Sequence, residues 1–139
     1  MKHVLADTGV WLALFDGRDQ YHNEAQVKAQ GLERFRLVLP WPTLYETLRT
    51  RFVRDRRALS GFERYLKRPN VTYLDDQPYR DEAFRYSMES SLRLSRPLSM
   101  ADCAIRLILD DVDTKIDYLI TFNQRDFIDV CQRRRIELI

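Results

Sequence analysis

The sequence has few cysteines and no cysteine motif that would bind a metal. Its 139 residues include two cysteines, Cys103 and Cys131. They form no C-x-x-C pair and no histidine cluster accompanies them, which argues against a zinc site and against a disulfide framework. Reduced thiols fit a cytoplasmic protein, and the cytoplasm is therefore the expected location.

Glycine is also scarce, and its spacing excludes one large class of proteins. The four glycines are scattered along the chain at Gly9, Gly17, Gly31 and Gly61. No G-x-G-x-x-G stretch can be formed from them, so a dinucleotide-binding Rossmann protein is excluded.

Long apolar runs and an excess of charge are absent as well. No stretch approaches the roughly 18 apolar residues of a membrane span. The apolar run that follows Met1, Lys2 and His3 is too short for a signal peptide, so no membrane association is expected. The formal net charge is only +2, because 23 basic residues nearly balance 21 acidic ones. The total charge therefore selects no partner class, and its distribution matters more.

The chain has the length of one domain, and we expect a single domain over residues 1–139. Apolar and turn-forming residues alternate in a way that predicts strands and helices in succession. The expected strands cover residues 4–6, 35–39, 71–74, 116–120 and 136–139. The expected helices cover residues 8–15, 21–33, 42–55, a short stretch from 60 that Pro69 stops, 79–94 and 99–109. This order predicts an α/β fold with a mostly parallel sheet between two layers of helices.

Four acidic residues fall at corresponding places in this pattern. Asp7 ends the first strand and Asp126 follows the strand 116–120, whereas Glu46 and Asp102 lie in the first turns of two predicted helices. Ligands of open α/β sheets bind at the carboxyl ends of the strands, so the four carboxylates are expected at one edge. Carboxylates that converge repel one another unless a cation lies between them. Mg²⁺ or Mn²⁺ is the usual solution, because both prefer oxygen ligands.

Each of these acids also has a purely structural explanation. Asp7 can cap the helix that begins at Thr8. The stretches 43–46 and 99–102 have capping-box form, and acids in a first helical turn interact favourably with the helix dipole. For any one acid the structural reading comes first. Four acids in four separate segments at one predicted edge shift the balance towards chemistry.

The sequence resembles the PIN-domain family. The resemblance rests on five stretches that occur in family order over nearly the whole chain: VLADTGVWLALF (4–15), DQYHNEA (19–25), PTLYE (42–46), LSMADCA (98–104) and TFNQRDF (121–127). It implies a PIN-like three-layer α/β/α fold and an endoribonuclease that uses Mg²⁺ or Mn²⁺ to activate water. Members of this size are often VapC-type toxins of type II toxin-antitoxin pairs, frequently dimeric, so an antitoxin and a second copy are implied partners.

The resemblance also implies roles for individual residues. Asp7 and Asp102 look like the principal metal ligands, and Glu46 looks like a further ligand or the group that orients the attacking water. The hydroxyls of Thr8 and Thr121 would hold ligands or a water molecule in place. The fourth position departs from the acidic family pattern, because Asn123 stands there. Either Asp126 supplies the carboxylate instead, or the site works with three acids.

Basic residues follow the second acidic motif. Arg49, Arg51 and Arg54 lie on or after the predicted Glu46 helix. A positive patch beside an acidic metal site would attract the phosphate backbone of RNA. The alternative is an ordinary solvated helix face, which is the commoner meaning of such charges.

Two other functional classes compete with the nuclease. A PIN-like scaffold that binds RNA or protein with little catalysis is supported by Asn123 alone. A phosphoryl-transfer module of another doubly wound fold would need D-x-D after the first strand or an acidic pair near the start of the chain. The sequence has Asp7-Thr8-Gly9 and no such pair.

Overall fold

The centre of the molecule is a five-stranded sheet in which every neighbouring pair of strands is parallel. The computed structural model describes residues 1–139. The strand order is β3-β2-β1-β4-β5. The strands are β1 (His3–Ala6), β2 (Arg36–Pro40), β3 (Val71–Leu74), β4 (Tyr118–Ile120) and β5 (Glu137–Leu138). The predicted α/β fold with a parallel sheet is confirmed.

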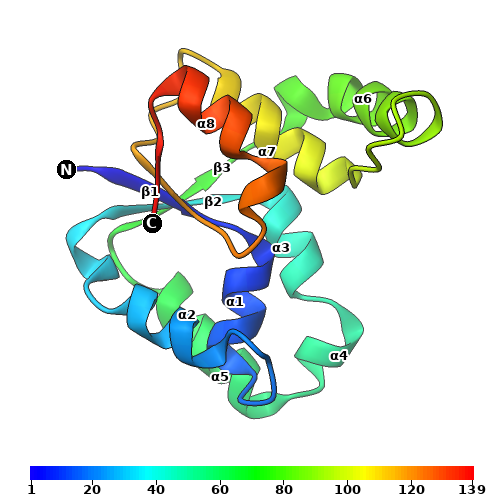
Figure 1. Cartoon of the computed structure of the whole chain (residues 1–139). Helices are drawn as coiled ribbons and strands as arrows, with labels where there is room; N and C mark the ends of the chain where they lie inside the picture. Colours follow the sequence, from blue (N-terminus) through cyan, green and yellow to red (C-terminus); the bar gives the residue numbers. More distant parts are fainter.

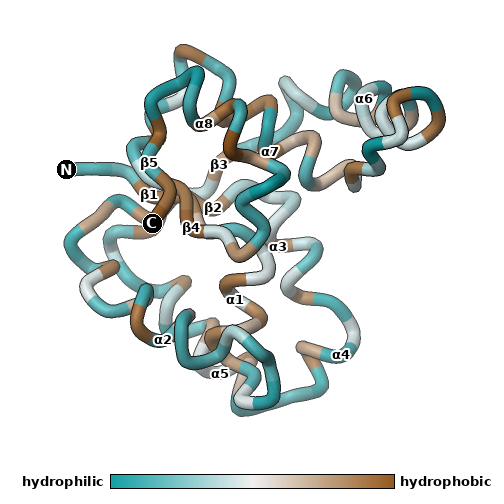
Figure 2. The backbone as a smooth tube through the Cα atoms, viewed as in Figure 1, coloured by the Kyte–Doolittle hydropathy of each residue, from teal (hydrophilic) through white to brown (hydrophobic).

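Both faces of the central strands are buried, since side chains alternate between the two faces and those on each face pack into an apolar cluster. In the central strand β1, Val4 and Ala6 pack into one apolar cluster and Leu5 packs into the other. In β2, Leu39 packs into the first of these clusters and Val38 packs into the second. Figure 2 shows the result as a hydrophobic centre around the strands, with hydrophilic segments on the outer helices. This explains why the strands read as continuous apolar runs in the sequence.

Helices cover the two faces of the sheet in two groups, which lie on opposite sides in Figure 1. The first group is α1 (Thr8–Phe15), α2 (His22–Ala29), α4 (Thr50–Val53) and α5 (Arg56–Leu66). The second is α7 (Met100–Asp110) and α8 (Ile128–Arg134), with α6 (Arg80–Leu92) packed on α7. The short α3 (Trp41–Thr47) contacts both α1 and α7. Three 3-10 helices complete the chain: η1 (Leu32–Arg34), η2 (Gln77–Tyr79) and η3 (Gln124–Asp126).

Trp11 connects α1 to β1 at Ala6, the residue before Asp7. The side chain is almost fully buried, and its ring N–H donates to the carbonyl of Ala6 at 3.2 Å. The ring of Phe62 meets it edge to face, with 5.4 Å between centroids. Removing a buried ring of this size costs about 3–5 kcal/mol of stability. The turn between β1 and α1, which carries Asp7, is therefore held in place by the core.

The predicted helix over residues 42–55 is wrong, because it is divided into α3 and α4. Leu48 leaves the helical conformation (φ −82°, ψ 37°) and Arg49 is extended. The ring of Phe52, on α4, packs edge to face on those of Phe15 and Phe62, and this contact turns the chain towards α1 and α5. Glu46 consequently lies in the last turn of α3 and not in a first turn.

Two other sequence expectations also need correction. The capping box over 43–46 does not form, because Pro40 is the N-cap of α3 and the buried hydroxyl of Thr43 has no partner. The helix expected from residue 60 begins at Arg56, because the Asp55 carboxylate accepts from the backbone N–H of Ala58 at 3.1 Å.

The expected helix 21–33 ends early. Gly31 has φ +83°, a left-handed conformation that suits glycine and separates α2 from η1. The other predicted elements lie within about two residues of their expected bounds, as is usual for helix and strand ends. The helix α8 was not predicted, because residues 128–134 were expected to connect two strands without a helix. None of the helices combines the length and the apolar character that a membrane span requires.

Candidate active site

The candidate site lies at the topological switch point of the sheet, where the order in which the chain adds strands reverses. The chain leaves β1 for β2 on one side of it, and β4 is followed by β5 on the other side. Open α/β sheets have a crevice at this point, outside the carboxyl ends of the strands. Asp7 directly follows β1 and Thr121 directly follows β4, which places both residues at this crevice.

Asp7 is a buried carboxylate that is held by two donors. Its Oδ1 accepts from the backbone N–H of Thr8 at 2.8 Å, and its Oδ2 accepts from the hydroxyl of Thr121 at 3.1 Å. Burial, together with the negative charges of Asp102 and Glu46, raises the pKa of Asp7 to about 6, and the two hydrogen bonds only partly offset this rise. No ion pair in the structure includes Asp7.

Glu46 reaches the same crevice from α3. Its Oε1 accepts from the hydroxyl of Thr8 at 3.1 Å, so Thr8 contacts Asp7 through its backbone and Glu46 through its side chain. Burial raises the pKa of Glu46 and so does the charge of Asp102, whereas Arg49 lowers it. Although α3 is shorter than predicted, Glu46 still lies beside Asp7 through their shared contact with Thr8.

Asp102 lies in the first turn of α7, as expected. Ser99 caps this helix, because its hydroxyl accepts from the backbone N–H of Asp102 at 3.0 Å. The Asp102 side chain is half-buried. Burial raises its pKa, and the charge of Asp126 raises it too. The structural and the chemical readings of this motif are therefore compatible, because the cap uses the backbone N–H of Asp102 as its donor.

The two candidates for the fourth position are bonded to each other. The side-chain amide of Asn123 donates to Oδ2 of Asp126, and the backbone N–H of Asn123 donates to the Thr121 hydroxyl at 3.0 Å. A continuous series of hydrogen bonds therefore runs from Asp7 through Thr121 and Asn123 to Asp126. In this arrangement the Asn123 side chain holds the Asp126 carboxylate by a hydrogen bond.

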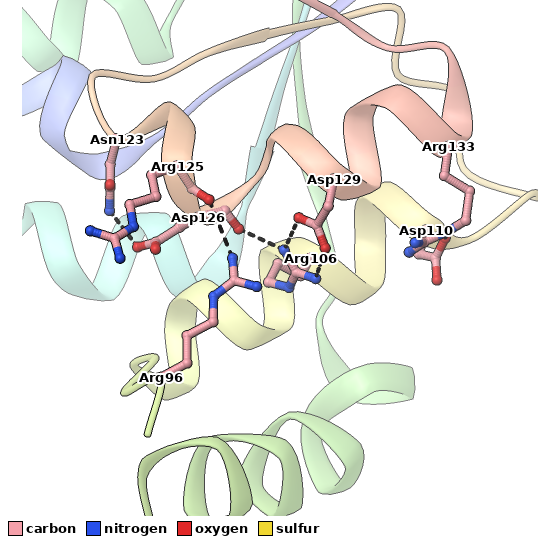
Figure 3. Close-up of polar contacts among 8 residues, drawn as sticks. All are labelled: Arg96, Arg106, Asp110, Asn123, Arg125, Asp126, Asp129 and Arg133. Carbon is pink, nitrogen blue, oxygen red and sulfur yellow. Dashed lines mark hydrogen bonds and ion pairs between the residues drawn. The ribbon is translucent and has the colours of Figure 1, made fainter. Parts of the chain in front are cut away.

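An arginine on α7 contacts the same corner, and the sequence analysis did not single it out. Figure 3 shows the Arg106 guanidinium between Asp129 and the backbone of η3. Both terminal nitrogens donate to the Asp129 carboxylate at 2.7 Å, and Nη1 also donates to the carbonyl of Asp126 at 2.6 Å. The bond from Arg106 holds the pKa of Asp129 well below its usual range. The available signal was one arginine in the apolar stretch 103–109, one helical turn after Asp102.

The chemistry of these donors fits a hard divalent cation. Carboxylate and hydroxyl oxygens are the ligands that Mg²⁺ and Mn²⁺ prefer. Neighbouring negative charges raise the pKa values of Asp7, Glu46 and Asp102, and a bound cation would reverse this effect. The side chains are not drawn together, however, since no group of three or more His, Cys, Asp or Glu residues is close enough to hold a metal ion.

The predicted basic residues lie partly beside this site. Arg49, Arg51 and Arg54 are all exposed. Arg49 and Arg51 line a hollow of about 120 Å³ together with Arg18, which the sequence analysis did not consider. Acidic residues share this hollow, and Asp16 lies 3.8 Å from Arg51. The patch is therefore mixed in charge and less basic than the sequence alone suggests.

Comparison with known proteins supports the fold and gives no family by sequence. No family model matches the chain, and no curated protein matches it. Among solved structures, a chain of the crystal structure of VapBC2 from Rickettsia felis bound to a DNA fragment from their promoter is similar. The match has a TM-score of 0.59 at 12% sequence identity, and covers 99% of this chain and 97% of that chain. This likeness shows a PIN-like fold over the whole chain.

Proposed function

We propose that this protein is a metal-dependent endoribonuclease of the PIN type. The observation that carries the proposal is the buried Asp7 carboxylate, which has Asp102 and Glu46 as charged neighbours and no cationic side chain in an ion pair with it. Burying a carboxylate near other negative charges without a cationic partner destabilises a protein, so such a carboxylate is characteristic of a functional site.

Mg²⁺ or Mn²⁺ is the proposed cofactor, with Asp7 and Asp102 as its principal ligands. When bound, such an ion supplies an activated water molecule and stabilises the charge that develops at phosphorus. Thr121 orients the Asp7 carboxylate, and Thr8 orients the Glu46 carboxylate. Glu46 would then accept a hydrogen bond from the attacking water or serve as a further ligand. Asp126, held by Asn123, would complete the site as the fourth acid.

RNA is the proposed substrate, and the arginines beside the site are its proposed contacts. Arg49 is close enough to Glu46 to lower its pKa, so a phosphate bound there would lie next to the reacting groups. Arg51 and Arg54 extend the positive charge along the exposed segment that follows α3. Contacts of this kind to the backbone supply affinity and little sequence preference.

A role as the toxin of a type II toxin-antitoxin pair extends this proposal. It is supported by the structural likeness to VapBC2, together with the short chain and the resemblance of the motifs to VapC-type toxins. An antitoxin protein and a second copy of the chain are then the proposed protein partners.

The decisive experiment is cleavage of a pool of structured RNAs by the purified protein with Mg²⁺, with Mn²⁺ and with EDTA. Cleavage that needs the metal and disappears in Asp7→Asn would support the nuclease. Folded protein that leaves every RNA intact under all conditions and binds no Mn²⁺ would favour the alternative, a catalytically weak scaffold that binds RNA or protein.

A further inference from the structure

Arg106 is an unusual residue for its position. It is 7% exposed and lies on α7 among the buried residues Cys103, Ala104, Ile105 and Ile108. Burying a guanidinium costs free energy unless its donors are paired. The Nε of Arg106 is buried without a partner, so this cost is only partly offset. The contacts that Arg106 does make therefore need an explanation.

These contacts join α7 and α8 to the segment that carries Asp126. The two bonds to Asp129 form a fork, which fixes the plane of the guanidinium more rigidly than a single bond would. With the plane fixed, Nη1 is aimed at the carbonyl of Asp126. Figure 3 shows this geometry. It also shows Arg96, whose guanidinium donates to the carbonyl of Arg125 in the same segment at 3.2 Å.

Apart from Arg106, the segment over residues 123–126 is held by the bonds of Asn123 to Thr121 and Asp126 and by the bond from Arg96 to Arg125. Its residues are exposed or half-buried, and it is only one turn of 3-10 helix. Short 3-10 turns have poor hydrogen-bond geometry and are weak by themselves. Within the turn, the N–H of Asp126 donates to the carbonyl of Asn123 at 3.2 Å, and that of Phe127 donates to the carbonyl of Gln124 at 3.0 Å.

We infer that Arg106 is a positioning residue, which fixes η3 so that the Asp126 carboxylate stays at the crevice beside Asp102. Arg106 is four residues after Asp102, so α7 carries one acid of the site and also the residue that fixes another. The inference rests on the proposed nuclease function for its purpose, but the fixing of η3 can be measured without activity.

A second ion pair between the same helices provides a matched control. Arg133 of α8 lies 3.1 Å from Asp110 of α7, with both side chains about half exposed, and Figure 3 shows it at the far end of the cluster. Neither residue is bonded to η3. Arg133→Met therefore removes one α7–α8 ion pair and leaves the Asp126 corner untouched.

The first measurement is amide hydrogen exchange of the metal-free protein. In Arg106→Met the amides of Asp126 and Phe127 should exchange about tenfold faster, because local opening of this turn becomes easier. Arg106→Lys, which keeps the charge but loses the fork, should have a smaller effect in the same direction and covers the case in which the Met variant fails to fold. Arg133→Met should leave both amides unchanged. Unchanged exchange in both Arg106 variants, or equal acceleration in Arg133→Met, would overturn the inference.

The second measurement is Mn²⁺ titration followed as a double-mutant cycle. Arg106→Lys should raise the Mn²⁺ concentration at half saturation by about tenfold, as loss of an outer-shell partner typically does. Asp126→Asn should weaken binding too, and the double variant should bind no more weakly than Asp126→Asn alone, because Arg106 acts through Asp126. Effects that add, or an Asp126→Asn protein with unchanged affinity, would overturn the inference while leaving the nuclease intact.

Failure of the proposed function gives a different result. If the wild-type protein neither cleaves RNA nor binds Mn²⁺, the nuclease is excluded and a purpose in positioning Asp126 for catalysis is excluded with it. The exchange data then decide only whether Arg106 fixes η3.

Discussion

The hydroxyl of Thr121 donates to Oδ2 of Asp7 over 3.1 Å, although 114 positions separate the two residues in the sequence. The bond connects the residues that follow two neighbouring strands, β1 and β4, at the topological switch point of the sheet. The other oxygen of Asp7 accepts from the backbone of Thr8. Each carboxylate oxygen has a second lone pair, so the same two bonds that orient Asp7 leave it able to bind a cation.

The stability of the metal-free protein should depend on the charge of Asp7. The pKa of Asp7 rises from 3.8 to about 6 on folding, so the folded state binds the proton more tightly. The contribution of protonated Asp7 to the free energy of unfolding is complete below about pH 4. It is lost as the pH rises through 6, and the loss amounts to at most roughly 3 kcal/mol. Asp7→Asn should remove this loss, so in EDTA the variant should be more stable than the wild type at pH 7. Urea unfolding of both proteins from pH 4 to pH 8 measures the difference. A constant difference across that range would show that Asp7 does not titrate in this way.

Asp102→Asn should abolish cleavage without unfolding the protein. The substitution removes a ligand charge and keeps both the side-chain shape and the backbone bond to Ser99. We expect the rate to fall by at least about 10²–10³-fold, the usual effect of removing one group that stabilises charge in a transition state. Asp110→Asn on the same helix is the control, because Asp110 pairs with Arg133 away from the crevice. Loss of the folded state in Asp102→Asn would favour a structural role for this acid.

The hydroxyl of Thr8 should matter for activity more than for stability. Thr8→Val keeps the shape and removes the bond to Glu46, so we expect kcat to fall about tenfold because Glu46 is no longer oriented. Thr8→Ser keeps the hydroxyl and should retain most of the activity. Steady-state cleavage rates of the two variants make the comparison, and similar rates would mean that this bond does not orient a reacting group.

Substitutions at the fourth corner should separate Asp126 from Asn123. Asp126→Asn removes a carboxylate, whereas Asn123→Ala removes only the side-chain donor that orients it. We expect the larger loss of activity, about 10²-fold, in Asp126→Asn and a loss of about tenfold in Asn123→Ala. Cleavage rates at saturating Mn²⁺ test this order. If neither variant changes the rate, the site works with three acids.

Arg49 should contribute to RNA affinity through the phosphate backbone. Arg49→Gln should weaken binding in a way that depends on salt, reducing the slope of log K against log salt concentration by about 0.7–0.9. Arg34→Gln is a suitable control, since Arg34 is exposed in η1 before the amino end of β2. Binding titrations with a catalytically inactive Asp7→Asn background at several salt concentrations give the slope. An equal effect of both substitutions would indicate general charge attraction and no specific contact.

The sequence by itself determined most of the elements and the edge at which the acids are found, although it did not predict α8 or the division of the helix over residues 42–55. The apolar run before Asp7 predicts a strand directly, because a strand buried on both faces needs an apolar side chain at nearly every position. The edge strand over residues 71–74 is not buried in this way, and its β-branched and aromatic residues predict it instead. Ser99 predicts the start of α7, because a local side-chain cap depends only on residues three positions apart. In a parallel sheet these local features suffice to place Asp7, Asp102 and Asp126 on the carboxyl side of the strands.

Only the tertiary structure decided which side chains contact one another. The break after α3 depends on the packing of Phe52 against Phe15 and Phe62, which no local pattern contains. Thr8 meets Glu46 across 38 positions, and Arg106 meets Asp129 across 23. Such pairs follow from strand order and helix packing, which bring distant segments together. The sequence could therefore name the candidate acids and, through the family resemblance, the hydroxyls of Thr8 and Thr121, whereas the contacts that these groups make and the role of the Arg106 guanidinium follow only from the assembled sheet.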